Sequence, residues 1–237
     1  MTHPSHEDNA TSIWNDGNGF APLGNDDFIF HGEIDGQGYT VSGLYMNTDY
    51  AFIRQAYYAE IKNIKFDNLD INANATVIHE GRNCIIDSVQ LFGNLTANTG
   101  SVGGLAGRLT DSHLSNIGVE MNVNNVSVWD HTGGVVGFLL GDSSLRKTYY
   151  KGNISGDNYV AGLIGDDISS SHNIVMEDVY VQGSVEARNG YPNHEGWFAV
   201  SIPSTSTLNR GYISASGGEQ ITLDSNIQNI YWDKNCN

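Results

Sequence analysis

Three tyrosines, Tyr149, Tyr180 and Tyr231, occupy the same position in three copies of a short phrase that alternates apolar and polar residues. If these copies are parallel strands on successive coils, the tyrosines form an outward ladder with a spacing of about 4.8 Å. Lys151 and Gln182 then lie in the next outward column. Sugar rings place their C–H faces on aromatic rings while their hydroxyls meet polar groups. The pattern therefore predicts a glycan-binding strip of these five residues or, as the plainer alternative, tyrosines that only stabilise the sheet.

Carboxylates that follow a glycine-rich phrase are the candidate metal ligands. Asp111, Asp142, Asp166 and Asp167 all lie shortly after such a phrase, and oxygen ligands of this kind favour Ca²⁺. Their offsets from the closing glycine differ, so they do not share one clean column. We therefore expect no resident cofactor, with Asp142, Asp166 and Asp167 as weak candidates for a structural calcium site.

Three acid–histidine neighbours occur, His79-Glu80, Asp130-His131 and His194-Glu195, and the last two are the candidate acid–base groups. Two coils would separate their carboxylates by roughly 10 Å, near the upper separation for an inverting glycosidase. Neighbouring residues in a strand point to opposite faces, however, and solvated loop residues are the plainer interpretation.

Two repeated phrases indicate the elements that would position these residues. The first phrase is Gly103–Gly107, which recurs as Gly133–Gly137 and Ala161–Gly165, with closing glycines 30 and 28 residues apart. Weaker copies of it lie at 51–53, 76–78 and 196–199. The second phrase has six copies, which begin at Ile61, Ile86, Leu114, Leu145, Met176 and Ile227.

The second phrase has the period of a half-buried strand, and no segment of helical length holds a 3.6 period. Strands separated by Gly, Asn or Asp corners and repeated every ~28 residues predict one coil per repeat. We therefore expect an all-β, right-handed parallel β-helix of about seven coils. Residues 1–25 are predicted to form an N-terminal cap, residues 26–237 the solenoid, and residues 201–222 an irregular loop. Asn63, Asn116 and Asn229 share one column, which predicts a bend.

Charge and composition exclude several function classes. The 237 residues carry a net charge of −16, which repels nucleic acid and anionic membrane at neutral pH. No apolar stretch is long enough to insert into a bilayer, and no signal peptide is visible after Met1. We expect an excised piece of a longer exported chain. Cys84 and Cys236 are the two cysteines, and either a disulfide or two free thiols would fit the sequence.

The phrases resemble the GLUG motif, named for its G-[GA]-L-x-G core. Gly103–Gly107, Gly133–Gly137 and Ala161–Gly165 match it well, whereas the copies at 51–53, 76–78 and 196–199 depart from it. The stretch from Trp14 to Val41 is similar to the usual lead-in of such arrays, and Ile230–Asp233 to their tail. The resemblance implies a secreted or surface bacterial protein, as in adhesins and the non-catalytic part of some immunoglobulin A peptidases. The motif is structural and brings no catalytic residues with it.

These observations favour a non-catalytic, secreted or cell-surface module of adhesin type. Its partner would be a host or environmental glycan, or a surface protein. One alternative is a polysaccharide-active enzyme, a lyase or glycoside hydrolase, with Arg146 and Lys147 as its basic residues. The other is a passive spacer that binds nothing.

Overall fold

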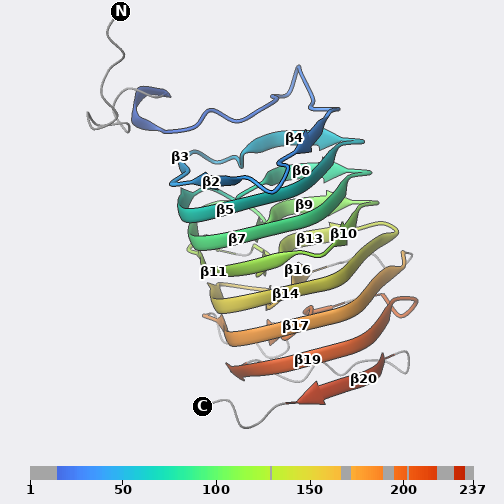
Figure 1. Ribbon diagram of the computed structural model, residues 1–237. Coiled ribbons are helices and arrows are strands. Elements are labelled where there is room, and N and C mark those ends of the chain that lie inside the picture. The colour runs from blue at the N-terminus through green and yellow to red at the C-terminus, as the bar shows by residue number, and fades with distance from the viewer. Residues whose placement is uncertain are drawn as a thin grey trace, which may run out of the picture.

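A computed structural model describes residues 15–128, 130–166, 172–188, 195–201, 203–217 and 227–232. Within these ranges the chain is all-β, apart from a short 3₁₀ turn at Asn15–Gly17. The strands stack in parallel into a solenoid of about 6 turns, close to the expected seven. In Figure 1 the strands in front run to the left and those behind run to the right as the chain descends, so the coil is right-handed.

One large sheet forms the front face in Figure 1. Its eleven strands pair in parallel, and the broken first rung is followed by long, nearly continuous rungs. The strands are β1 (Glu33–Asp35), β2 (Thr40–Ser42), β3 (Tyr45–Asn47), β5 (Glu60–Asn72), β7 (Ile85–Ala97), β10 (His113–Ser115), β11 (Gly118–Asn125), β14 (Ser143–Gly156), β17 (Ile174–Ala187), β19 (Thr207–Gly217) and β20 (Ile227–Trp232).

Two smaller parallel sheets complete each coil behind the large sheet. Four short strands form the first: β8 (Val102–Gly103), β12 (Thr132–Gly133), β15 (Val160–Ala161) and β18 (Glu195–Gly196). Five strands form the second: β4 (Ile53–Tyr57), β6 (Ile78–Arg82), β9 (Ala106–Thr110), β13 (Val136–Leu140) and β16 (Ile164–Asp166).

The glycine phrase builds the tight corner between the two small sheets, and we call it the glycine corner. Its copies are in the predicted register, because Gly133 pairs with Gly103 above and with Ala161 below. A Cβ on Gly134 would lie 2.2 Å from the carbonyl oxygen of Gly162 on the next coil and 2.5 Å from the ring of Tyr150. The second glycine of the phrase is therefore required by close approach of backbones between coils, with a large core side chain packed above it.

The chain bends at the same place on six successive rungs of the large sheet, from β5 to β19. The bend residues have left-handed backbone angles with φ between 48° and 59°; they are Asn63, Ser88, Asn116, Lys147, Asp178 and Arg210. On β5 the bend residue Asn63 is exposed, and the next residue, Ile64, is buried. The bend expected at Asn63 and Asn116 is confirmed, whereas the side chain of Asn229 lies outside the described residues.

The region expected to be an irregular loop contains a full rung of the large sheet. Residues 207–217 form β19, which pairs with β17 on one side and β20 on the other. The alternating pattern is hidden there because Gly211 occupies an inward position that is apolar on most rungs. The ring of Phe198 fills the space, with its Cζ 2.6 Å from where a Cβ of Gly211 would lie.

Columns of apolar side chains from all three sheets fill the inside of the coil. Inward residues such as Ile61, Ile86, Leu145 and Met176 are at most 1% exposed. Tyr150 is also fully buried, and its hydroxyl donates a hydrogen bond of 2.9 Å to the carbonyl oxygen of Met121. The polar end of this large side chain is thus satisfied inside the core.

The described part of the predicted N-terminal cap, residues 15–25, lies on the first coil. The amides of Phe20 and Leu23 donate to the carbonyl oxygens of Tyr45 and Phe52. Cys84 is buried, and its Sγ lies 3.2 Å from the carbonyl oxygen of Ala56. Cys236, its suggested partner, lies outside the described residues.

Candidate functional site

Four tyrosines form one outward column on the large sheet, and we call it the tyrosine column. The register pairs Tyr149 with Tyr180, Tyr180 with Tyr212, and Tyr212 with Tyr231. Tyr180 and Tyr231 are therefore two rungs apart and not one, because β19 inserts Tyr212 between them. The column therefore contains four tyrosines, whereas the sequence predicted three.

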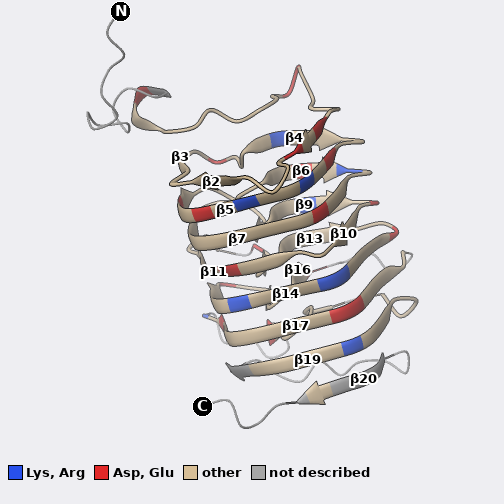
Figure 2. Cartoon of the chain, in the orientation of Figure 1, with Lys and Arg blue, Asp and Glu red and all other residues tan. Residues whose placement is uncertain are grey.

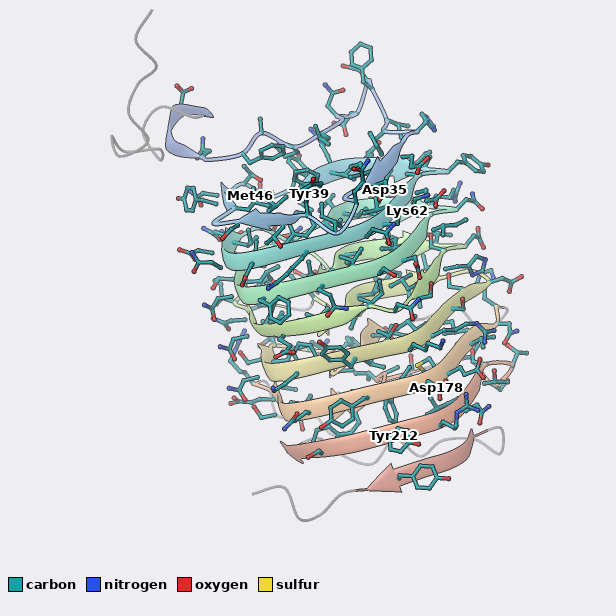
Figure 3. All side chains as sticks on the ribbon, in the orientation of Figure 1. Asp35, Tyr39, Met46, Lys62, Asp178 and Tyr212 are labelled. Atoms are coloured by element: carbon teal, nitrogen blue, oxygen red, sulfur yellow. The ribbon has the colours of Figure 1, made fainter. Side chains whose placement is uncertain are left out.

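The two C-terminal tyrosines form an exposed, stacked pair. Tyr212 is 42% exposed and Tyr231 is 51% exposed. Their ring centroids are 5.1 Å apart and their planes differ by 16°. Figure 3 shows Tyr212 on the face of the large sheet near its C-terminal end. The pair is a rigid aromatic surface, because each ring limits the rotation of the other.

Tyr149 lies against the sheet instead of standing away from it. Its ring extends over Gly118 on the preceding rung, where a Cβ would lie 2.6 Å from the ring Cζ. Its hydroxyl lies 3.1 Å from both Gln90 Oε1 and Glu120 Oε1. Burial, and secondly the carboxylate of Glu120, raise the pKa of Tyr149 to about 12. Gly118 therefore determines the orientation of the first tyrosine of the column.

The polar column expected beside the tyrosines is present. Lys151 pairs with Gln182 in the strand register, and its Nζ lies 3.4 Å from Glu120 Oε2. The hydroxyl of Tyr180 lies 3.1 Å from Gln182 Oε1. Polar groups therefore border the rings of Tyr149 and Tyr180.

The column continues toward the N-terminus with polar residues. Gly118 pairs with Gln90, and Gln90 pairs with Lys65. Lys65 Nζ lies 3.0 Å from Asp67 and 4.6 Å from the ring centroid of Phe92. A shallow hollow of about 460 Å³ lies at this end, and we call it the polar hollow. It is lined by Asp35, Gln37, Gly38, Asn63, Ile64, Lys65, Ser88 and Gln90.

Charged side chains of opposite sign pair between successive rungs next to the bend residues of the large sheet. Figure 2 shows their alternating colours on β14, β17 and β19. Arg146 pairs with Glu177, which also contacts Arg210. Arg210 binds Asp178 as well, and this contact lowers the pKa of the Asp178 carboxyl. Arg146, one of the two suggested basic residues of an enzyme, is therefore part of an ion-pair network. Lys147, the other, is a bend residue.

The candidate calcium ligands do not converge. Asp111 Oδ1 accepts the amide of Asp142, and Asp142 Oδ1 accepts the amide of Asn173, both at 3.1 Å. These carboxylates therefore cap the next coil. Asp166 is 1% exposed and contacts Ser201, and Asp167 lies outside the described residues. In the described ranges, no group of three or more His, Cys, Asp or Glu side chains is arranged to hold a metal ion.

The acid–histidine neighbours also separate. Asp130 Oδ2 accepts the amide of Gly100 at 2.9 Å, whereas His131 Nε2 lies 3.3 Å from Asp166 Oδ2, a different carboxylate. Glu195 Oε1 accepts the amide of Ala187, and His194 lies outside the described residues. The interpretation as a loop residue fits Asp130, whereas Glu195 is the first residue of strand β18.

An asparagine ladder at the far edge of the large sheet could not be found from the repeat phrases. Asn122 Nδ2 donates to Asn94 Oδ1 at 3.1 Å, and Ser184 Oγ donates to Asn153 Oδ1 at 2.8 Å. The amide of Asn153 donates to Asn122 Oδ1, so the contacts link four rungs. The recurrence of Asn in the second half of β5, β7, β11 and β14 was the available signal.

Comparison with known proteins gives one partial similarity. No family model matches the chain, and no solved structure matches it. The chain is 31% identical over 160 residues to a protein named Halomucin from Haloquadratum walsbyi (strain DSM 16790 / HBSQ001). The aligned stretch is 65% of this chain but 1% of Halomucin, so the chain spans a very small part of that relative. In the described ranges, no helix has the length and apolar character needed to cross a bilayer. The β-solenoid is consistent with a surface or structural module.

Proposed function

We propose that this chain is a non-catalytic, adhesin-type module of a secreted or cell-surface protein, built from GLUG-type repeats, that binds glycan through the tyrosine column. The observation that carries the proposal is the exposed pair Tyr212 and Tyr231, stacked at 5.1 Å at the end of an unbroken column of tyrosines. Rigid aromatic side chains with few rotatable bonds lose little conformational entropy on binding.

The chemistry around the column suits sugars. Each tyrosine offers an apolar ring with a hydroxyl, and Lys151 and Gln182 add polar groups beside the rings. A sugar ring needs this combination, since its C–H face is apolar and its rim carries hydroxyls. The exposed rings of Tyr212 and Tyr231 stand on neighbouring strands, and the parallel pairing of β19 and β20 holds them in register.

Two observations support a surface location and a role without catalysis. The partial similarity to Halomucin and the solenoid fold support an extracellular module. The residues that were suggested as catalytic groups have structural contacts: Arg146 pairs with Glu177, and Asp130 caps an amide of the neighbouring coil. An acid pair that converges on an open groove would favour the enzyme alternative instead.

Glycan-array binding of the wild-type protein and of the variant Y212A/Y231A tests the proposal, with and without calcium. F28A is the matched control, because Phe28 is 74% exposed and lies outside the column. Y212F/Y231F keeps the rings and removes the hydroxyls, and circular dichroism checks that each variant is folded. We expect F28A to bind like the wild type and Y212A/Y231A to lose binding. If the folded wild type binds no glycan, the proposal fails and a spacer or a protein-binding module is the better interpretation.

A further inference from the structure

The polar hollow lies in line with the tyrosine column, at the opposite end of the large sheet. The outward positions Lys65, Gln90, Gly118, Tyr149, Tyr180, Tyr212 and Tyr231 follow one another with one residue per rung. Six rung spacings of about 4.8 Å give a line of about 29 Å parallel to the solenoid axis. Figure 3 shows Asp35, which lines the hollow, near the N-terminal end of the large sheet and Tyr212 near its C-terminal end.

We infer that the polar hollow is a second sugar-binding subsite, and that the ligand is a linear, uncharged oligosaccharide that lies along the solenoid axis from the hollow to Tyr231. This inference rests on the proposed function, since it extends the same ligand beyond the tyrosine column. A terminal sugar alone would need one end of this line, whereas an extended chain of several sugars uses both.

The hollow presents the polar groups that sugar hydroxyls require. Asn63 Nδ2 donates to Asp35 Oδ1 at 3.1 Å, which fixes an amide and a carboxylate side by side. The amide of Gln37 donates to the same Asp35 oxygen at 2.9 Å. Paired amide and carboxylate groups can accept and donate to neighbouring hydroxyls of one sugar. Gly38, with no heavy atom within 4 Å of where its Cβ would lie, leaves the hollow open.

Gln90 and Tyr149 join the hollow to the aromatic column. Gln90 lines the hollow, and its Oε1 contacts the hydroxyl of Tyr149 at 3.1 Å. The ring of Tyr149 covers Gly118, so no other side chain of the column stands between Gln90 and Tyr149. Glu120 of the same rung contacts the Tyr149 hydroxyl. The line is therefore continuous from polar groups to aromatic rings.

Charge selects against acidic polysaccharides. The chain has a net charge of −16, and Asp35 is part of the hollow itself. Lys65, the cation of the hollow, is paired with Asp67. A uronate or sulfated chain would meet repulsion from Asp35 and from the net negative charge of the protein. An uncharged chain avoids this penalty.

The test compares ligand lengths by isothermal titration calorimetry. The probes are a disaccharide and a hexasaccharide of the neutral glycan that gives the strongest array signal, and a uronate hexasaccharide. The variants are K65A/Q90A, which removes two groups of the hollow, and Q90E, which keeps the side-chain shape. T96A is the matched control, because Thr96 is exposed on the same strand β7 and lies outside the line.

We expect K65A/Q90A to weaken hexasaccharide binding about tenfold, as the loss of two hydrogen bonds would, and to leave disaccharide binding unchanged. Q90E should weaken hexasaccharide binding as well, and T96A should bind both ligands like the wild type. If the hollow variants bind the hexasaccharide normally while Y212A/Y231A does not, this inference fails and the proposed function stands. Tighter binding of the uronate chain would also overturn the inference. If no oligosaccharide binds the wild type, both fail.

Discussion

The glycine corner and the tyrosine column repeat along the same axis, but different forces determine them. At the corner, backbones approach so closely that a Cβ on Gly134 would lie 2.2 Å from the carbonyl oxygen of Gly162. On the column, the residue changes from Lys65 to Gln90 to tyrosine while the strand register is unchanged. The corner is constrained by the shape of the coil, whereas the face is free to vary.

This difference separates architecture from recognition. A buried backbone contact permits few residues, so the corner retains the same phrase on three coils. An outward side chain of the large sheet packs mainly against the side chains on the neighbouring rungs of the same column. Differences between coils on that face, such as the step from Gln90 to Tyr149, are thus where a specific ligand would be recognised.

The largest effect is expected from Gly134→Ala at the corner. The new methyl group would clash with backbone on one side and with the buried ring of Tyr150 on the other, so neither neighbour can move freely. We expect a loss of about 3 kcal/mol or more in the free energy of unfolding. Chemical denaturation followed by circular dichroism measures it.

Gly32→Ala is the matched control for that prediction. The nearest atoms to a Cβ on Gly32 belong to the partly exposed ring of Phe30, at 3.0 Å, and this ring can shift. We expect Gly32→Ala to lower the free energy of unfolding much less than Gly134→Ala does. Equal losses for the two variants would show that the corner has no special packing constraint.

The same contrast explains what the sequence could predict. The sequence predicted which residues of the glycine corner pair between coils, and this prediction is correct to the residue. Gly103, Gly133 and Ala161 occupy the same position because the same steric constraint recurs on each of these coils. Tyr212 was missed because Gly211 breaks the apolar alternation, and its missing side chain is replaced by Phe198 from the corner. Such compensation between distant residues leaves no local pattern. The position of Tyr149 over Gly118 likewise depends on contacts between rungs.

Tyr150→Phe tests the inner face of the rung whose outer face carries Tyr149. The Tyr150 hydroxyl is buried and donates to the carbonyl oxygen of Met121. Removing it leaves that buried carbonyl without its partner, so we expect a loss of about 1–3 kcal/mol in unfolding free energy. Thermal and urea denaturation measure the loss. A neutral result would mean that the hydrogen bond contributes nothing inside the core.

A double-mutant cycle on Tyr212 and Tyr231 measures the coupling on the outer face. The stacked pair should contribute about 0.5–1.5 kcal/mol of interaction energy beyond the two single effects. The single variants are Y212A and Y231A. Urea denaturation gives the free energy of unfolding of the wild type, the two single variants and the double variant. Zero coupling would indicate that the rings are independent, and it would weaken the argument that they form one rigid surface.

The smallest effect on stability is expected from Tyr149→Phe, which loses contacts to Gln90 and Glu120 at the partly exposed surface. We expect about 0.5 kcal/mol at neutral pH. Because the pKa of Tyr149 is about 12 in the folded protein and 10.0 for an ordinary tyrosine, the unfolded chain loses this proton first. The contribution of Tyr149 to stability is therefore present below pH 10 and falls as the pH rises toward 12. An alkaline titration followed by tyrosinate absorbance should show a step near pH 12 in the wild type that is missing in Y149F. If the difference between the two curves instead appears near pH 10, the Tyr149 hydroxyl is neither buried against the sheet nor held by Glu120, and the described position of Tyr149 is wrong.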